Sequence, residues 1–145
     1  LDEGAGAVYV AVSTQGTVVA IPIMDDGSAG EPALHTTFTN DQGMVGVDGV
    51  ALDGAGNLYV AQTAANVVVR VTPDGTIATV ATVADGLDGP TSVAVGTGAD
   101  GAERLYIASW SDALGEIAPP DGGGPTLAMV PLGSVGHGRP ATGDW

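Results

Sequence analysis

The sequence predicts an all-β fold of many short antiparallel strands, and three features support this prediction. Twenty-four glycines and nine prolines interrupt the 145 residues at short intervals, which favours tight turns. Hydrophobic residues make up 44% of the chain but aromatic residues only 4%, so the chain is apolar enough to fold while each strand buries little surface. A pattern of strands and turns also recurs three times, as in repeat proteins.

A tyrosine marks each repeat. Tyr9, Tyr59 and Tyr106 each follow a Gly-rich stretch and begin a short apolar run, and they lie 50 and 47 residues apart. The chain divides into repeats at approximately 1–43, 44–86 and 87–135, followed by a C-terminal tail at 136–145.

The first repeat begins at its second strand. The run that contains Tyr9 is followed by an apolar run at 17–23, a turn at Asp25-Asp26-Gly27 and a third strand. Asp-Gly pairs supply the positive φ angle that tight hairpin turns require. Because no strand-like run comes before Tyr9, we expect this repeat to lack its innermost strand.

The middle repeat contains a full set of four strands, which we predict at 47–53, 57–62, 66–72 and 76–83. Asp74-Gly75 forms the turn between the last two. Threonines alternate with apolar residues along 76–83, as expected of an outer strand with one solvated face.

The last repeat contains a strand that ends at Trp110, a weaker run at 114–118 and a turn at Asp121-Gly122. Four antiparallel strands repeating every 40 to 50 residues or so are typical of β-propeller blades. We therefore predict a β-propeller fragment of about three four-stranded blades. Propellers close with about four to eight blades, so we expect a partner to complete the ring, either a missing N-terminal half or a second copy of the chain.

Charge and composition exclude several classes of function. The chain has 17 acidic residues, three arginines and no lysine, for a net charge of −14, and such a surface repels nucleic acid and anionic membranes. No apolar run approaches the roughly 20 residues of a membrane-spanning helix. Without cysteine there is no disulfide, thiol nucleophile or Cys-based zinc site. A lysine-free acidic surface favours an extracellular or periplasmic location.

Several segments resemble one known family. The sequences VDGVALD (47–53), GNLYVA (56–61), VRVTPDG (69–75) and LDGPTSVAVGTG (87–98) are similar to blades of the SMP-30/gluconolactonase/LRE-like family. The end of the chain, GPTLAMVPLG (124–133), resembles the C-terminal end of its secreted members. The resemblance implies the C-terminal half of a six-bladed propeller that hydrolyses a lactone or small ester with the help of a divalent metal, commonly calcium.

The resemblance also implies one metal ligand. In the family a Glu, an Asn and the Asp of a Pro-Asp-Gly-Met-like motif hold the metal, and only the last of these maps onto this chain, at Asp48. Val47 and Val50 stand where the motif has Pro and Met. The other two ligands would lie upstream of Leu1. Because Ca²⁺ takes six to eight oxygen ligands, we expect no metalloenzyme activity from this chain alone.

Asp48 is also a candidate from its place in the repeat, since it begins the innermost strand of the middle blade at the predicted channel mouth. The alternative is that Asp48 caps its own turn with Gly49. Thr91 occupies the equivalent place in the last repeat. Gln62, Thr63 and Asn66 follow a second strand, and the alternation of strand direction puts them on the same face as Asp48.

We therefore interpret Thr91, Gln62 and Asn66 as candidate substrate-binding residues. Trp110 joins them because an indole at the channel rim can stack on a sugar or lactone ring, although ordinary packing explains it equally well.

The other polar residues are assigned structural roles. The acidic turns recur in register with the repeat, and the 53–57 segment fits a hairpin loop better than a calcium loop. His35 is expected on an outer strand and His137 in the tail. A non-catalytic propeller module for binding or assembly remains an alternative to the hydrolase, because fold alone does not fix function.

Overall fold

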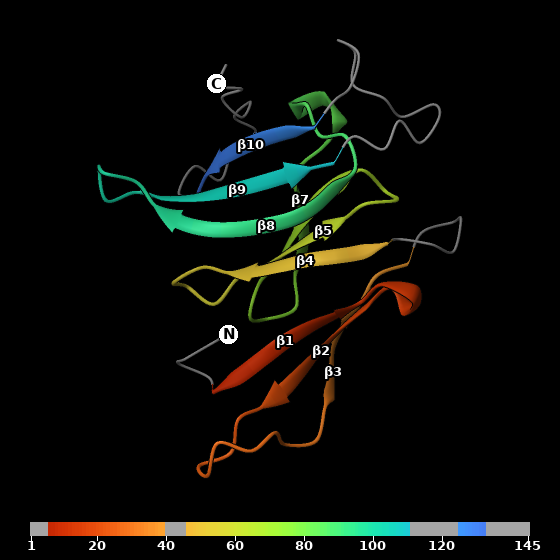
Figure 1. The fold of residues 1–145 in the computed structure, drawn as a ribbon, viewed down its shortest axis with the longest axis vertical. Coiled ribbons are helices and arrows are strands. Elements are labelled where there is room, and N and C mark those ends of the chain that lie inside the picture. The colour runs from red at the N-terminus through yellow and green to blue at the C-terminus, as the bar shows by residue number, and fades with distance from the viewer. Residues whose placement is uncertain (1–5, 40–45, 111–124, 133–145) are drawn as a thin grey trace.

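The computed structural model describes residues 6–39, 46–110 and 125–132, which form ten strands in three antiparallel sheets. The helical elements in these segments are two short 3-10 turns, η1 (Ser13–Gln15) and η2 (Val83–Asp85). The sheets are stacked, with the first at one end and the third at the other (Figure 1). The predicted all-β propeller fragment is confirmed. The exact blade boundaries stay a prediction.

The first sheet contains β1 (Ala7–Val12), β2 (Thr17–Pro22) and β3 (Ala33–Thr37) in this order. β1 pairs with β2 along its whole length, with Tyr9 opposite Ala20. On its other side β1 has no partner among the described residues, as expected of a sheet without its innermost strand. His35 lies on the outer strand β3, where its ring meets that of Tyr9 edge to face.

The middle sheet has the order β4 (Val47–Leu52), β5 (Leu58–Gln62), β6 (Val67–Val71) and β7 (Ile77–Ala81). Each of the four strands lies within its predicted range. The prediction succeeds here because Gly and Asp-Gly turns separate apolar runs of strand length.

The third sheet has the order β8 (Pro90–Thr97), β9 (Glu103–Ser109) and β10 (Thr126–Pro131). β10 therefore occupies the third position, next to β9, with Met129 opposite Tyr106. The predicted run at 114–118, the turn at Asp121 and the tail at 136–145 lie outside the described residues. The described part of this blade has three strands rather than the four predicted.

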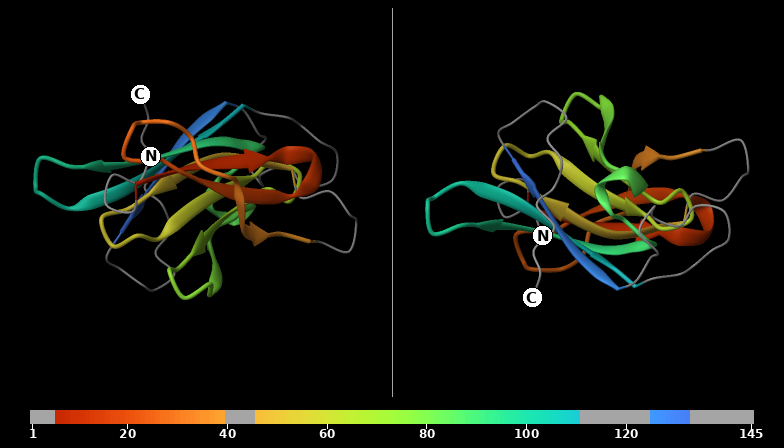
Figure 2. Two further views of the ribbon diagram at one scale, coloured as in Figure 1. Left: turned by 90° about the horizontal axis from the view of Figure 1, so that it is seen from below. Right: turned by 90° about the horizontal axis from the view of Figure 1, so that it is seen from above.

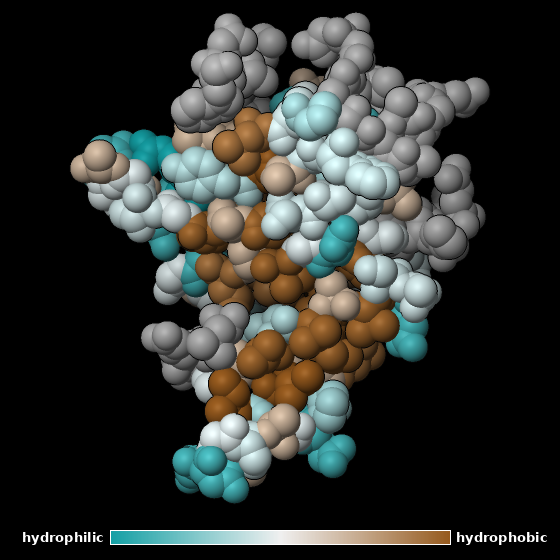
Figure 3. Space-filling view, in the orientation of Figure 1, coloured by the Kyte–Doolittle hydropathy of each residue, from teal (hydrophilic) through white to brown (hydrophobic). Residues whose placement is uncertain are grey.

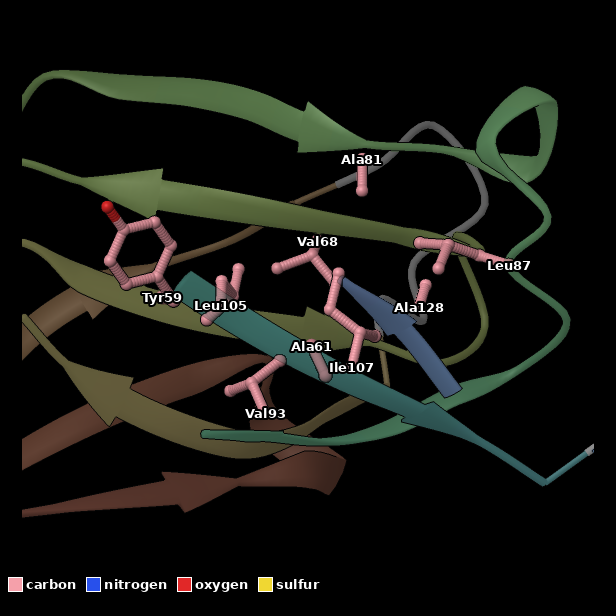
Figure 4. Packing of buried hydrophobic residues seen from close by; sticks show 9 residues of the cluster. All are labelled: Tyr59, Ala61, Val68, Ala81, Leu87, Val93, Leu105, Ile107 and Ala128. Atoms are coloured by element: carbon pink, nitrogen blue, oxygen red, sulfur yellow. The ribbon is translucent and has the colours of Figure 1, made fainter. Parts of the chain in front are cut away.

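The hydrophobic core lies on both sides of the middle sheet. Along β5, Leu58 and Val60 belong to the cluster shared with the first sheet, while Tyr59 and Ala61 belong to the cluster shared with the third. In Figure 4, Val68, Leu105 and Ile107 project into the space between the second and third sheets. All five residues of β5 are buried as a result.

Asp53 organises the hairpin between β4 and β5. Its carboxylate accepts hydrogen bonds from the backbone N–H groups of Ala55 and Asn57, both at 2.9 Å, from Nδ2 of Asn57 at 2.7 Å and from the Tyr59 hydroxyl at 2.9 Å. Partial burial raises the pKa of Asp53, but these hydrogen bonds outweigh that effect and hold the pKa below its usual value. The expected hairpin loop at 53–57 is thus observed.

Asp53→Asn should lower the free energy of unfolding by about 1–3 kcal/mol at pH 7, because a charged acceptor of four hydrogen bonds is lost. A depressed pKa gives stability that is present above the unfolded-state pKa of about 3.9 and is lost as the pH falls through the folded-state pKa. Urea unfolding should therefore show the two proteins converging below about pH 4.

Asp74→Asn is the matched control for this measurement. Asp74 sits in the turn between β6 and β7, and this exposed carboxylate accepts hydrogen bonds from Thr72 and from the backbone N–H of Thr76. Its replacement should cost less than that of Asp53. An Asp53→Asn deficit of equal size at pH 7 and pH 3 would contradict the account given for Asp53.

Candidate functional site

The candidate residues lie at one edge of the stack, which we call the η1 edge. It holds η1, the start of β4, the β5–β6 loop, the start of β8 and the end of β9, as the terminal pairs Val47–Gln62 and Pro90–Ser109 require. The turns with Asp26, Asp53, Asp74 and Asp100 lie at the opposite edge. Figure 2 shows η1 and the β8–β9 hairpin on opposite sides of the molecule.

Asp48 lies at the η1 edge, near the start of β4, with its side chain exposed. The register between β4 and β5 shifts between Val47 and Val50, so Asp48 and Gly49 lie in a β-bulge. No hydrogen bond joins the Asp48 carboxylate to a described residue, so those residues do not support its alternative role as the cap of its own turn. The carboxylate oxygens are free to accept a ligand.

Gly49 fixes the position of Asp48 by permitting a very close approach of two backbones. A Cβ atom at Gly49 would lie 2.6 Å from Cα of Ser92 and 2.8 Å from the carbonyl oxygen of Thr91. These distances are too short for any side chain, so β4 meets β8 backbone to backbone at this point. The structure therefore brings Asp48 and Thr91 together, as the repeat predicts.

The first sheet holds the other side of this bulge. The Ser13 hydroxyl, on η1, donates a hydrogen bond to the carbonyl oxygen of Val47. The Val47–Gly49 segment is thus held on both sides, by the Ser13 side chain of η1 and by the backbone of β8. Sequence reasoning missed the role of Gly49, although a glycine inside a strand often marks such a close approach.

Asn66 and Thr63 join the second sheet to the third. Asn66 has a left-handed φ of 54° and its Oδ1 accepts a hydrogen bond from the backbone N–H of Gly89 at 3.0 Å. The Thr63 hydroxyl donates to the carbonyl oxygen of Pro90 at 2.8 Å. Gln62 is buried opposite Val47. All three lie at the η1 edge as expected, whereas direct contact of Gln62 and Asn66 with a substrate stays a prediction.

Two further polar residues where the second sheet meets the third, Asp88 and Ser109, were not identified from the sequence. Asp88 is only 1% exposed, and its Oδ2 has no hydrogen-bond partner within the described part of the chain. Its backbone N–H points to the buried Ser109 hydroxyl at 3.4 Å. Nothing local distinguishes Asp88 from the other Asp-Gly pairs of the chain, so only the packing of the two sheets reveals its burial.

Trp110 lies at the η1 edge with its side chain 61% exposed, so it is available for stacking. Its backbone N–H donates to the carbonyl oxygen of Gly89 at 3.2 Å. Thr91 is half-buried, and its hydroxyl approaches the carbonyl oxygen of Ala108 at 3.5 Å. His137 lies outside the described residues.

Within residues 6–39, 46–110 and 125–132, no group of three or more His, Cys, Asp or Glu side chains is placed to hold a metal ion. Asp48 is therefore not part of such a group within these residues, and its role as a metal ligand stays a prediction. The same residues contain no helix long and apolar enough to span a membrane.

Comparison with known proteins identifies a family and several solved structures that resemble this chain. The model of the SMP-30/gluconolactonase/LRE-like region matches residues 2–111. No curated protein sequence matches the chain significantly.

Three solved structures share the fold. Luciferin-regenerating enzyme superposes with a TM-score of 0.67 at 20% identity, over 88% of this chain and 42% of its own. Regucalcin from Agrobacterium tumefaciens, described as a calcium-binding protein, gives 0.61 at 21%, over 97% and 44%. A streptogramin B lyase gives 0.51 at 14%, over 93% and 40%. The chain thus spans less than half the length of each.

Gly49→Ala should lower the free energy of unfolding by about 1–3 kcal/mol, because the added methyl group must push β8 away from β4. Urea unfolding measures this loss. Gly54→Ala is the matched control, since a Cβ there would meet the flexible Glu103 carboxylate, whose Oε1 lies 3.3 Å away. Equal stability of the two variants would show that the backbones of β4 and β8 are not in contact.

Proposed function

The chain belongs to the SMP-30/gluconolactonase/LRE-like family, and from this premise we propose that it forms one part of a metal-dependent propeller hydrolase. The completed propeller hydrolyses a lactone or a related small ester. Its solved structural relatives are more than twice as long, which supports a ring completed by further blades.

The observation that carries this proposal is the placement of Asp48. It is an exposed carboxylate without a hydrogen-bond partner among the described residues, held in a bulge between η1 and β8, within the part of the chain that matches the family. Structural side chains of this kind are normally engaged in a turn, as Asp53 and Asp74 are. A free carboxylate in a rigid frame is suited to bind a cation.

The chemistry of the neighbouring donors fits a hard divalent cation. Asp48 offers carboxylate oxygens, and oxygen donors of this kind suit Ca²⁺. The likeness to regucalcin, whose structure is described as that of a calcium-binding protein, supports the same choice. One carboxylate does not complete the coordination shell, so the remaining ligands come from the completing blades.

When bound, such a cation polarises a carbonyl group and lowers the pKa of a water molecule. The chain's own residues hold the cation and orient the substrate. Asp48 binds the cation, and Trp110 offers an exposed ring face to the substrate. Gln62 and Asn66 lie at the same η1 edge. The Asn66 side chain accepts a hydrogen bond from Gly89 and so holds the start of β8 in place.

A non-catalytic propeller module is the second candidate. The described residues offer Asp48 as a lone ligand, which is compatible with a mouth that binds a small neutral molecule without any metal. Calcium titration of the completed protein separates the two candidates, because only the hydrolase depends on the ion.

Asp48→Ala in the completed propeller should weaken Ca²⁺ binding by at least about tenfold and abolish hydrolysis of a simple lactone, because a charged ligand is lost. Isothermal titration with Ca²⁺ and a hydrolysis assay measure the two effects. Asp74→Ala is the control, since it removes the same charge at the opposite edge and should change neither. Unaltered Ca²⁺ affinity in the Asp48 variant would refute the assignment.

A further inference from the structure

Two hydroxyl groups at equivalent places of the repeat carry an inference about how the site residues are oriented. Ser13 lies four residues after Tyr9, and Thr63 lies four residues after Tyr59. We propose that Ser13 is a positioning residue for Asp48. The inference rests on the proposed function for what Asp48 binds, and it specifies which contact orients the carboxylate.

Each hydroxyl donates a hydrogen bond to the first residue of the inner strand in the following sheet. Ser13 donates to the carbonyl oxygen of Val47, where β4 begins, and Figure 1 shows η1 beside this end of β4. Thr63 donates to the carbonyl oxygen of Pro90, where β8 begins, at 2.8 Å. In the third sheet Trp110 takes this place, and its indole provides no hydroxyl. The same contact is thus built twice, and we call each copy a hydroxyl clasp.

A β-bulge directly follows each clasped residue. The register between β4 and β5 shifts after Val47, and the register between β8 and β9 shifts after Pro90. Asp48 lies in the first of these bulges and Thr91 in the second. Because a bulge leaves its extra residue outside the regular ladder, pairing within the sheet does not fix these two residues. Contacts from outside the sheet must therefore orient them.

Two such contacts hold the bulge of β4, one from each neighbouring sheet. From the third sheet, the backbone of β8 meets Gly49, where a Cβ would lie 2.6 Å from Cα of Ser92. From the first sheet, the Ser13 hydroxyl binds the carbonyl oxygen of Val47. This carbonyl belongs to the peptide group that links Val47 to Asp48. The hydrogen bond therefore restrains rotation of that peptide, and with it the direction of the Asp48 side chain.

Apolar packing, rather than this hydrogen bond, holds the first two sheets together. Val18 on β2 and Leu58 and Val60 on β5 are buried in the cluster that the two sheets share. Figure 3 shows hydrophobic residues gathered over β1 and β4. A single partly buried hydrogen bond contributes little to stability beside such burial. The Ser13 clasp therefore restrains a local direction more than it stabilises the fold, which is what distinguishes a positioning residue from a structural one.

The second clasp indicates which substitution should preserve the first. Thr63 makes the equivalent contact with a threonine hydroxyl, so Ser13→Thr should keep the clasp, whereas Ser13→Ala removes it. Ser28→Ala is the matched control. The Ser28 hydroxyl follows β2 in the same part of the chain, but it donates to Oδ1 of Asp26 at 2.6 Å, at the edge opposite to Asp48.

Ser13→Ala in the completed propeller should weaken Ca²⁺ binding by about tenfold, because contacts that orient a metal ligand have effects of this size. Isothermal titration with Ca²⁺ measures the loss, under conditions where every variant is folded. Ser13→Thr should restore the affinity, and Ser28→Ala should leave it unchanged. Full affinity in Ser13→Ala, beside weakened binding in Asp48→Ala, would overturn the inference and leave the proposed function standing.

A second readout needs no metal. In the metal-free completed propeller, hydrogen exchange of the amides of residues 48–50 should be at least about tenfold faster in Ser13→Ala, while exchange of the β5 amides stays the same. A merely structural role would speed exchange on both strands alike, and either that result or unchanged exchange on both would overturn the inference. If Asp48→Ala keeps its Ca²⁺ affinity, the proposed function fails, and the exchange measurement alone decides on the clasp.

Discussion

Burial of the middle sheet on both faces is the constraint on which the rest of the structure depends. β5 sends Leu58 and Val60 into one core and Tyr59 and Ala61 into the other, so neighbouring sheets are held at fixed distances from it. Because Gly49 has no side chain, the inner strands β4 and β8 come close enough for their backbones to touch there. The place of Asp48 beside Thr91 is a consequence of that spacing.

The sequence predicted the features that depend on local pattern, and not those that depend on the distance between sheets. The strands of the middle blade follow from apolar runs between Asp-Gly turns, and Asp48 and Thr91 emerge at equivalent places of the repeat. The tight contact of Gly49, the burial of Asp88 and the hydrogen bond from Gly89 to Asn66 all join residues of different sheets. Apart from a glycine inside a strand, which often marks a close approach, a single sequence carries no signal for such distances.

The proposed function links cation binding to completion of the ring. Asp48 is held in place by η1 and β8, so its position does not depend on a bound ligand. One carboxylate, however, binds a cation only weakly. Under the proposed function, affinity would arise when further oxygen donors are brought to the same site. A cation that bound only the completed ring would stabilise the assembled form by mass action, so assembly and the proposed metal site would reinforce each other.

The strands β5 and β6 raise a separate question of solubility before folding is complete. Leu58–Gln62 and Val67–Val71 are short runs of high β-propensity that the native sheets cover. When neighbouring sheets do not cover them, such runs can stack into cross-β aggregates. Arg70 interrupts the valine run with a charge, and its Nε has no hydrogen-bond partner among the described residues. A charge within such a run opposes this stacking before folding is complete.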